Sequence, residues 1–247
     1  MCSYAAAQSI EWRNGAAESL RARHFGVGIL CGSFLVLATI LQQIGIVTTT
    51  TAKSGFITAL YIVIVPILGI LLKRMPAPTI WLGVMLSMVG LYFLCMTDSL
   101  TLNAGDMITL CSAFAYAAHI TLIDRLGGSL NSARLSAIQF GTAAVISCVI
   151  TFVLETPTME GILACWKDVL FVAVCSGALG YTFQIIGQKY TEPTLASLIL
   201  CLESVFAAVG GWVLLNQTLS GREMLGCTLM LCASVVALLP AKKRSEK

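Results

Sequence analysis

Residues 25–47 read FGVGILCGSFLVLATILQQIGIV and contain no formally charged side chain. A helix needs about 20 apolar residues to cross the ~30 Å hydrocarbon core of a bilayer, so this stretch is long enough. Similar stretches recur along the chain, and the charged residues cluster in short groups between them. The chain is 57% hydrophobic with a mean hydropathy of +0.89, whereas soluble domains are roughly 45–50% apolar. The sequence therefore predicts an all-α, polytopic membrane helix bundle.

We expect eight transmembrane helices joined by short loops that leave no room for an extramembrane domain. Pro66 lies inside the second of them, where its missing N–H predicts a bend. The predicted spans are Phe25–Val47, Ser54–Leu72, Pro78–Thr97, Met107–Ile123, Leu135–Leu154, Val169–Gln188, Pro193–Leu215 and Met224–Leu239.

Lysine and arginine are divided unequally between the two sides that these spans define. Three of the 15 basic residues fall on one side, namely Lys53, Lys167 and Arg222. The other side, which includes both termini, holds Arg13, Arg21, Arg23, Lys73, Arg74, Arg125, Arg134, Lys189, Lys242, Lys243, Arg244 and Lys247. Because basic residues are enriched in cytoplasmic loops, we expect both termini in the cytoplasm.

Several classes of function lack their motifs in this sequence. The ten cysteines form no CxxC pair, and most lie in apolar spans as small hydrophobic residues, so we expect no metal and no cofactor. No basic stripe with interleaved aromatic residues predicts nucleic-acid binding. The chain has no nucleotide-binding P-loop, no HExxH and no GxSxG motif, which argues against an ATP-driven pump and against an intramembrane enzyme.

An internal repeat links the two halves of the chain. LQQIGIVTTTTAKSG at residues 41–55 is similar to FQIIGQKYTEPTLAS at residues 183–197, with Gln42 and Gly45 matching Gln184 and Gly187 at a shift of 142 residues (184 minus 42). Two later matches, such as Gly83 with Gly226, need a shift of 143 residues (226 minus 83). Three consecutive spans of residues 25–97 thus recur in residues 169–239. The equivalent helices lie five spans apart, an odd number, so the two copies are expected to run in opposite directions, as in secondary transporters.

Longer strings make the sequence resemble a known family. TTTTAKSGFITALYIVIVPILG (residues 48–69), ITLIDRLGGSLNSARLSAIQF (residues 120–140) and GQKYTEPTLASLILCLESVFAAVGGWVLLNQTLSGREMLGCTLM (residues 187–230) look like the EamA-type branch of the drug/metabolite transporter superfamily. The resemblance extends from about Phe25 to Pro240. It implies two inverted five-helix repeats that move small metabolites, often amino acids and frequently outward, across the plasma or inner membrane.

The resemblance also implies a domain organisation. Residues 25–97 correspond to a remnant of the first repeat with three helices, and residues 105–240 to a complete second repeat with five. Residues 1–24 and 241–247 are cytoplasmic segments at the two ends. The first two helices of the usual ten have no counterpart, so a non-transporting fragment, or one subunit of a multi-chain membrane assembly, is the alternative to a carrier.

Two charged side chains are the first candidates for a substrate or proton pathway. Glu203 is expected near the bilayer centre, where a carboxylate costs at least ~2.5 kcal/mol unless it is paired, protonated or hydrated. It either binds a substrate amine or a coupling proton, or joins helices as a structural hydrogen-bonding group. Lys53 begins the second span and either reaches the interface or turns inward to face a carboxylate, that of Glu203 or that of a substrate.

Polar uncharged side chains supply the remaining candidates. Tyr116 and His119 share a face of one predicted helix, and His119 either relays protons or bridges helices as a neutral donor. Gln42 and Gln184 are equivalent in the repeat and either line a central cavity or hold helices together. We therefore expect a carrier of a small-molecule substrate that alternates access between inverted repeats in the lipid bilayer, with a homodimer as an open option.

Overall fold

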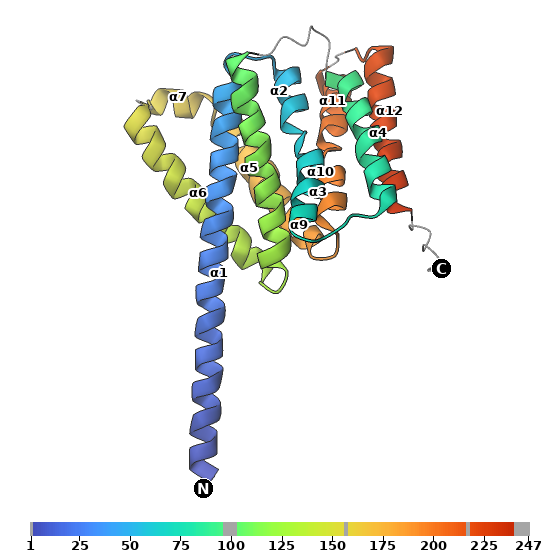
Figure 1. Ribbon diagram of the computed structural model, residues 1–247. Helices are drawn as coiled ribbons and strands as arrows, with labels where there is room; N and C mark the ends of the chain where they lie inside the picture. The colour runs from blue at the N-terminus through green and yellow to red at the C-terminus, as the bar shows by residue number, and fades with distance from the viewer. Residues whose placement is uncertain (1, 96–102, 156–157, 216–217, 240–247) are drawn as a thin grey trace, which may run out of the picture. The chain divides into compact units, whose positions relative to one another are not determined.

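The computed structural model describes residues 2–95, 103–155, 158–215 and 218–239, and every regular element among these residues is a helix (Figure 1). The helices are α1 (Cys2–Ile46), α2 (Thr51–Thr58), α3 (Tyr61–Leu71), α4 (Pro78–Cys95), α5 (Ala104–Gly127), α6 (Ser132–Leu154), α7 (Met159–Ala164), α8 (Trp166–Phe171), the π-helix η1 (Val172–Tyr181), α9 (Thr182–Gln188), α10 (Pro193–Leu200), α11 (Glu203–Leu215) and α12 (Gly221–Leu238).

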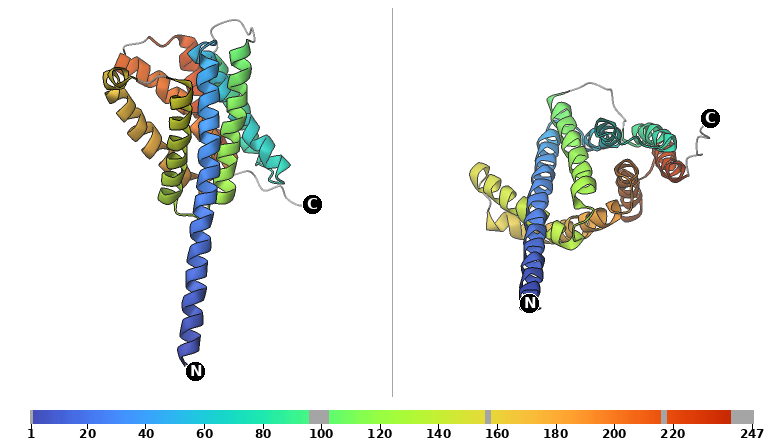
Figure 2. Two further views of the ribbon diagram at one scale, coloured as in Figure 1. Left: turned by 90° about the vertical axis from the view of Figure 1, so that its left-hand side faces the viewer. Right: turned by 60° about the horizontal axis from the view of Figure 1, so that its bottom comes forward.

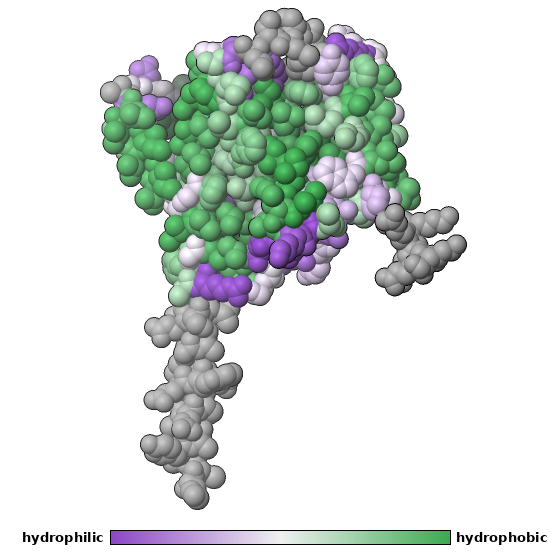
Figure 3. Space-filling model, viewed as in Figure 1, coloured by the Kyte–Doolittle hydropathy of each residue, from purple (hydrophilic) through white to green (hydrophobic). Residues whose placement is uncertain are grey.

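Eight stretches in the described part of the chain are long and apolar enough to span a membrane, which confirms the predicted number. Their bounds are Ala22–Ile46, Thr51–Leu71, Pro78–Cys95, Ala104–Gly127, Ser132–Leu154, Trp166–Gln188, Pro193–Leu214 and Gly221–Leu238. On the face drawn in Figure 3, hydrophobic side chains cover the flanks of the helices and hydrophilic side chains gather mainly at the helix ends, as a lipid environment requires.

Local side-chain chemistry explains where several helices begin. The hydroxyl of Thr50 accepts the backbone N–H of Lys53 at 3.3 Å and caps α2, and Asn131 caps α6 in the same way. Pro193 occupies the first turn of α10, where no backbone N–H is needed. Ser220 and Glu223 form a reciprocal capping box at α12. Each cap satisfies donors that the first helical turn leaves without a partner.

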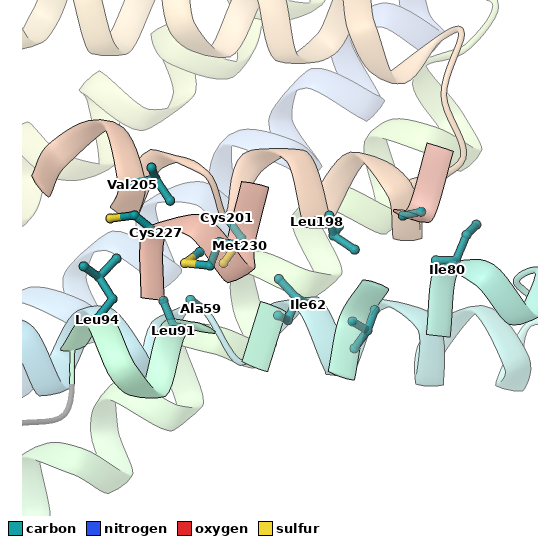
Figure 4. Packing of buried hydrophobic residues seen from close by; sticks show 12 residues of the cluster. Ala59, Ile62, Ile80, Leu91, Leu94, Leu198, Cys201, Val205, Cys227 and Met230 are labelled. Carbon is teal, nitrogen blue, oxygen red and sulfur yellow. The ribbon is translucent and has the colours of Figure 1, made fainter. Parts of the chain in front are cut away.

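The chain divides into two compact units. One contains residues up to 36 and residues 122–189, and the other contains residues 37–121 and 190–247. In this second unit, hydrophobic side chains from α3, α4, α10, α11 and α12 form one cluster (Figure 4). Ile62, Leu91, Leu198 and Met230 are fully buried there. Burying each such side chain is worth roughly 1.5–3 kcal/mol in water, whereas in lipid the gain comes mainly from close packing.

Helices α4 and α12 lie side by side and touch through small residues (Figures 1 and 2). A Cβ atom built on Gly226 would lie 2.6 Å from the Gly90 carbonyl oxygen, and one built on Gly90 would lie 2.8 Å from the Gly226 carbonyl oxygen. The backbones can therefore approach this closely only because both positions lack a side chain.

Equivalent residues of the two repeats make equivalent contacts on the two sides of this interface. Adding 143 to the bounds of α4 gives the bounds of α12, since 78 becomes 221 and 95 becomes 238. A Cβ on Gly83 would meet the Ala233 carbonyl oxygen at 3.0 Å and the Ala237 Cβ at 2.9 Å. A Cβ on Gly226, the equivalent of Gly83, would meet the equivalent atoms, the Gly90 carbonyl oxygen at 2.6 Å and the Leu94 Cβ at 3.0 Å.

Two membrane spans of the second unit are not continuous helices. The span Thr51–Leu71 is interrupted at Ala59 and Leu60, between α2 and α3, and the span Pro193–Leu214 is interrupted at Cys201 and Leu202, between α10 and α11. The two interruptions are 142 residues apart (201 minus 59), the shift at which Gln42 matches Gln184. We call these two sites the first and the second helix break.

The backbone hydrogen bonds at the two breaks also correspond. At the first break, Leu60 N–H donates to Ile57 O at 3.1 Å and Ile62 N–H donates to Ala59 O at 3.1 Å. At the second break, the equivalent bonds run from Leu202 N–H to Ile199 O at 3.0 Å and from Ser204 N–H to Cys201 O at 3.2 Å. Both breaks are therefore tight turns with i to i−3 bonds, which satisfy backbone groups that the α-helix would otherwise lose.

The broken helices run in opposite directions. Figure 1 shows α2 above α3, whereas α10 lies below α11. Pro66 does not cause the first break, because it is buried inside α3, and the break precedes it by six or seven residues. No glycine or proline marks the break itself, and the bend predicted at Pro66 falls within α3.

The other unit has a smaller core, formed by Val27, Cys31, Ile123, Leu130, Leu135 and Ile185. The Nε2 of His24 accepts the Asn131 N–H at 3.0 Å, and Lys189 Nζ donates to the Leu130 carbonyl, so both side chains hold the turn before α6. Hydroxyls of Ser136 and Thr182 bond at 2.7 Å between α6 and α9. Outside this core, α6 and the span Trp166–Gln188 present mostly exposed apolar side chains, which suits a lipid-facing surface.

We predict that Gly226→Ala lowers the free energy of unfolding by about 1–3 kcal/mol, because the new methyl group would press on backbone atoms of Gly90 and Leu94 rather than on a flexible side chain. Gly210→Ala is the matched control, since a Cβ there meets no atom within 4 Å. Thermal unfolding in detergent measures both, and equal midpoints for the two variants would contradict the close contact.

Candidate functional site

A polar network joins α1, α2 and α5 in the second unit. The Tyr116 hydroxyl donates to Gln42 Oε1 at 3.1 Å and lies 3.4 Å from the Thr39 hydroxyl. The Gln42 amide nitrogen in turn donates to the Thr58 hydroxyl at 3.1 Å. The structure thus brings together two residues that the sequence singled out separately, Gln42 and Tyr116, although 74 residues separate them in the chain.

This network adjoins the first helix break. Thr58 is the last residue of α2, directly before Ala59. Leu60 of the first break and Leu200, which directly precedes the second break, pack against one cluster formed by residues of α3 and α5. The helix that carries Tyr116 therefore contributes to the apolar cluster that adjoins both breaks.

Lys53 pairs with Asp106, a residue that the sequence argument did not select. Lys53 Nζ lies 2.5 Å from Asp106 Oδ2, and the Thr49 hydroxyl donates to Asp106 Oδ1 at 2.6 Å. Asp106 is 1% exposed and Lys53 is 13% exposed. Lys53 therefore turns inward to a carboxylate, but this carboxylate is that of Asp106 and not that of Glu203 or of a substrate, the two partners that the sequence suggested.

A capping interaction fixes the position of Asp106. Its Oδ2 accepts the Asn103 N–H at 2.8 Å, and the Asn103 side-chain oxygen accepts the Asp106 N–H at 2.9 Å. The spacing Asn-x-x-Asp before an apolar run is the sequence signal of such a cap. Asp106 directly precedes the predicted span Met107–Ile123 and was not among the candidates, although its spacing from Asn103 could have identified it.

One face of α5 is polar along most of its length. Asp106, Thr109, Ser112, Tyr116 and His119 follow one another at intervals of three or four residues, so they share a face over about 20 Å. All but Tyr116 are at most 1% exposed. The Ser112 hydroxyl has no hydrogen-bond partner among the described residues, and neither has the buried hydroxyl of Ser54 on α2.

Glu203 lies at the second helix break. It is the first residue of α11, so its carboxylate is placed at the positive end of that half-helix dipole. Its side chain is exposed on the surface of its unit. Glu203 is the eleventh residue of the 22-residue span Pro193–Leu214, but it stands at a helix terminus inside that span and not within a continuous helix.

The remaining sequence candidate, Gln184, lies in α9 and belongs to the first unit, where its side chain is partly exposed. Within the described residues, no three His, Cys, Asp or Glu side chains gather in a way that could hold a metal ion. The chemistry available at the two breaks is therefore that of amide, hydroxyl and phenol hydrogen bonding, with one carboxylate at the second break.

The fold and the polar groups at the paired breaks define a multi-pass membrane transporter. The model of the EamA-like transporter family matches residues 103–239, more than half of the chain, so the chain belongs to this family, which is a family of transporters rather than of enzymes.

Two curated proteins and one solved structure show the extent of the similarity. An uncharacterized transporter of Archaeoglobus fulgidus is 29% identical over 221 residues, which are 89% of this chain and 71% of that protein. The threonine/homoserine exporter RhtA of Salmonella typhimurium is 24% identical over 180 residues, which are 70% of this chain and 59% of the exporter. A crystal structure of a protein that is 15% identical has a TM-score of 0.72 and matches 92% of this chain and 88% of its own, which shows the shared fold.

We predict that Tyr116→Phe and Gln42→Leu each lower the free energy of unfolding by about 1 kcal/mol, and that the double variant loses less than the sum, because both changes remove one shared hydrogen bond. Gln43→Leu serves as the control for the amide, since Gln43 is exposed beside Gln42. Denaturation in detergent gives the four free energies, and strict additivity would contradict the bond.

Proposed function

We propose that the protein is a secondary carrier that exports a small metabolite, such as an amino acid, by alternating access between inverted repeats. The observation that carries the proposal is the pair of antiparallel broken helices, whose breaks correspond in sequence and in backbone hydrogen bonding. Transporters bind their substrates at such interrupted helices, because there the backbone and helix termini can face a polar solute. Membership of the EamA-like transporter family supports the same conclusion.

The domain organisation belongs to this proposal. We assign residues 25–97 to a three-helix part of the first repeat and residues 105–240 to the second repeat with five helices. The equal lengths of α4 and α12 and the reciprocal contact between them support the assignment. In this arrangement the two breaks come from different repeats, as a site between inverted repeats needs.

The polar groups at the breaks suggest how a substrate is held. Glu203 would receive an amine, because its carboxylate is the charged group at the second break. Gln42 and Tyr116 would bind uncharged polar groups of the substrate by exchanging their mutual hydrogen bond for bonds to the solute. His119 and Gln184 remain candidates for a proton or substrate pathway. The similarity to an exporter of threonine and homoserine supports an amino-acid substrate.

We predict that the purified chain in proteoliposomes moves one or more members of an amino-acid panel, and that Glu203→Gln lowers the rate about tenfold, because a hydrogen bond to a charged group is worth roughly 1.5–3 kcal/mol. Glu160→Gln is the control, since Glu160 is exposed in α7 of the other unit. Assays with and without a pH gradient separate proton coupling from facilitated exit.

Absence of transport would overturn the carrier proposal. If no solute moves in this chain, nor in a version extended at its start by two hydrophobic spans, the protein functions as a non-transporting fragment or as a subunit of an assembly. If Glu203→Gln and Glu160→Gln transport equally well, the carrier stands and the role of Glu203 fails.

We further predict that both termini face the cytoplasm, because 12 of the 15 basic residues lie on their side of the predicted spans. A fluorescent protein fused after Lys247 should therefore fold and emit, whereas a periplasmic phosphatase at the same place should be inactive. A fusion within residues 155–160 should give the reverse pair of results, and agreement between the two fusion sites would contradict the topology.

A further inference from the structure

The two broken spans differ in their first helices, α2 and α10, at the end that lies away from the break. In α2, Lys53 stands three residues after the cap and forms the ion pair with Asp106. In α10, the equivalent positions at shifts of 142 and 143 residues are Leu195 and Ala196, and the whole of α10 contains no charged residue. The two repeats therefore correspond in the backbone hydrogen bonds at their breaks, but of the two first helices α2 carries the ion pair and α10 does not.

The ion pair is attached to a rigid base. A Cβ atom on Gly105 would lie 2.5 Å from the Gly45 carbonyl oxygen, and one on Gly45 would lie 2.8 Å from the Gly105 carbonyl oxygen. Helices α1 and α5 are thus in backbone contact beside Asp106. Because Thr49 and Asn103 also donate to its carboxylate, Asp106 is held in place independently of Lys53.

Helix α2, which carries Lys53, is a short element beside this base. It is eight residues long, and the first helix break at Ala59 and Leu60 separates it from α3. The Ser54 hydroxyl, next to Lys53, is buried and has no hydrogen-bond partner among the described residues. Such a hydroxyl gains a hydrogen bond when water or solute reaches it, so opening at α2 recovers part of the cost of separating the ion pair.

We propose that Lys53 and Asp106 latch α2 as the closed gate at one end of the transport pathway, and that α10, which has no such latch, leaves the resting carrier open at the other end. The inference rests on the proposed function. With the predicted orientation, the latched gate faces outward and the resting carrier opens to the cytoplasm. An exporter in this state is ready to load its substrate.

Hydrogen–deuterium exchange in lipid nanodiscs tests the latch without substrate. In Lys53→Met, the α2 amides should exchange at least about tenfold faster, because removal of one partner leaves a buried carboxylate unpaired. The α10 amides should exchange more slowly in the same variant, since opening of one gate closes the other. Asp106→Asn should act in the same direction, and Lys53→Arg, which keeps the charge, should match the unsubstituted chain.

Lys167→Met is the matched control, because Lys167 is exposed and predicted to lie on the same side of the membrane. It should leave both exchange rates unchanged. Unchanged α2 exchange in Lys53→Met overturns the latch, and faster exchange in α2 and α10 together shows a merely structural ion pair and overturns it as well. The exchange rates are measured without a transported solute. A failed transport assay would therefore reject the carrier, whereas the exchange experiment by itself decides whether Lys53 and Asp106 hold α2 in place.

Discussion

The architecture depends on the requirement that every backbone hydrogen-bonding group in lipid finds a partner within the protein. A break in a membrane helix is therefore tolerated only where protein surrounds it and where alternative bonds replace the lost ones. Both breaks meet these conditions. Ala59 is 5% exposed and Cys201 is 1% exposed, both belong to the same hydrophobic cluster, and both lie in turns with i to i−3 bonds. Both interruptions are thus placed in an apolar core, and i to i−3 bonds replace α-helical bonds at each of them.

Helix α5 connects this core to the charged and polar side chains. Its residues Ala113 and Ala117 belong, with residues of α3, to the cluster that adjoins both breaks, and its polar face contacts α1 and α2. Tyr116 and Asp106, which lie ten residues apart on this helix, are thus linked to opposite ends of α2, Asp106 through Lys53 and Tyr116 through Gln42 and Thr58. One helix therefore carries both the ion pair at the start of α2 and the hydrogen-bond network at its end.

Much of this organisation is readable from the sequence, and the limits have physical causes. Apolar length alone predicts the eight spans, with bounds that differ from the observed ones by at most four residues, because the bilayer thickness leaves little freedom. The breaks could not be predicted, since Ala59, Leu60, Cys201 and Leu202 are all compatible with helix and only tertiary packing favours the turn. The pairing of Gln42 with Tyr116 depends on helix rotation, which uniformly apolar helices do not encode. Asp106 was the avoidable omission, because its capping partner Asn103 stands three residues before it.

The reciprocal glycine contact between α4 and α12 has a consequence for how the chain can vary. Two identical subunits related by a two-fold axis make contacts of this kind, in which each surface meets its own copy. Here both surfaces belong to one polypeptide, so Gly83 and Gly226 can mutate separately. Each of them nevertheless faces the helix that carries the other, since Gly83 contacts α12 and Gly226 contacts α4. A larger residue at Gly83 can be accommodated by a smaller residue at Ala237, where the contact is to the side-chain Cβ, but not by a change at Ala233, whose contacting carbonyl oxygen belongs to the backbone. Sequence changes in the two halves of the chain are therefore coupled where side chains meet across this contact.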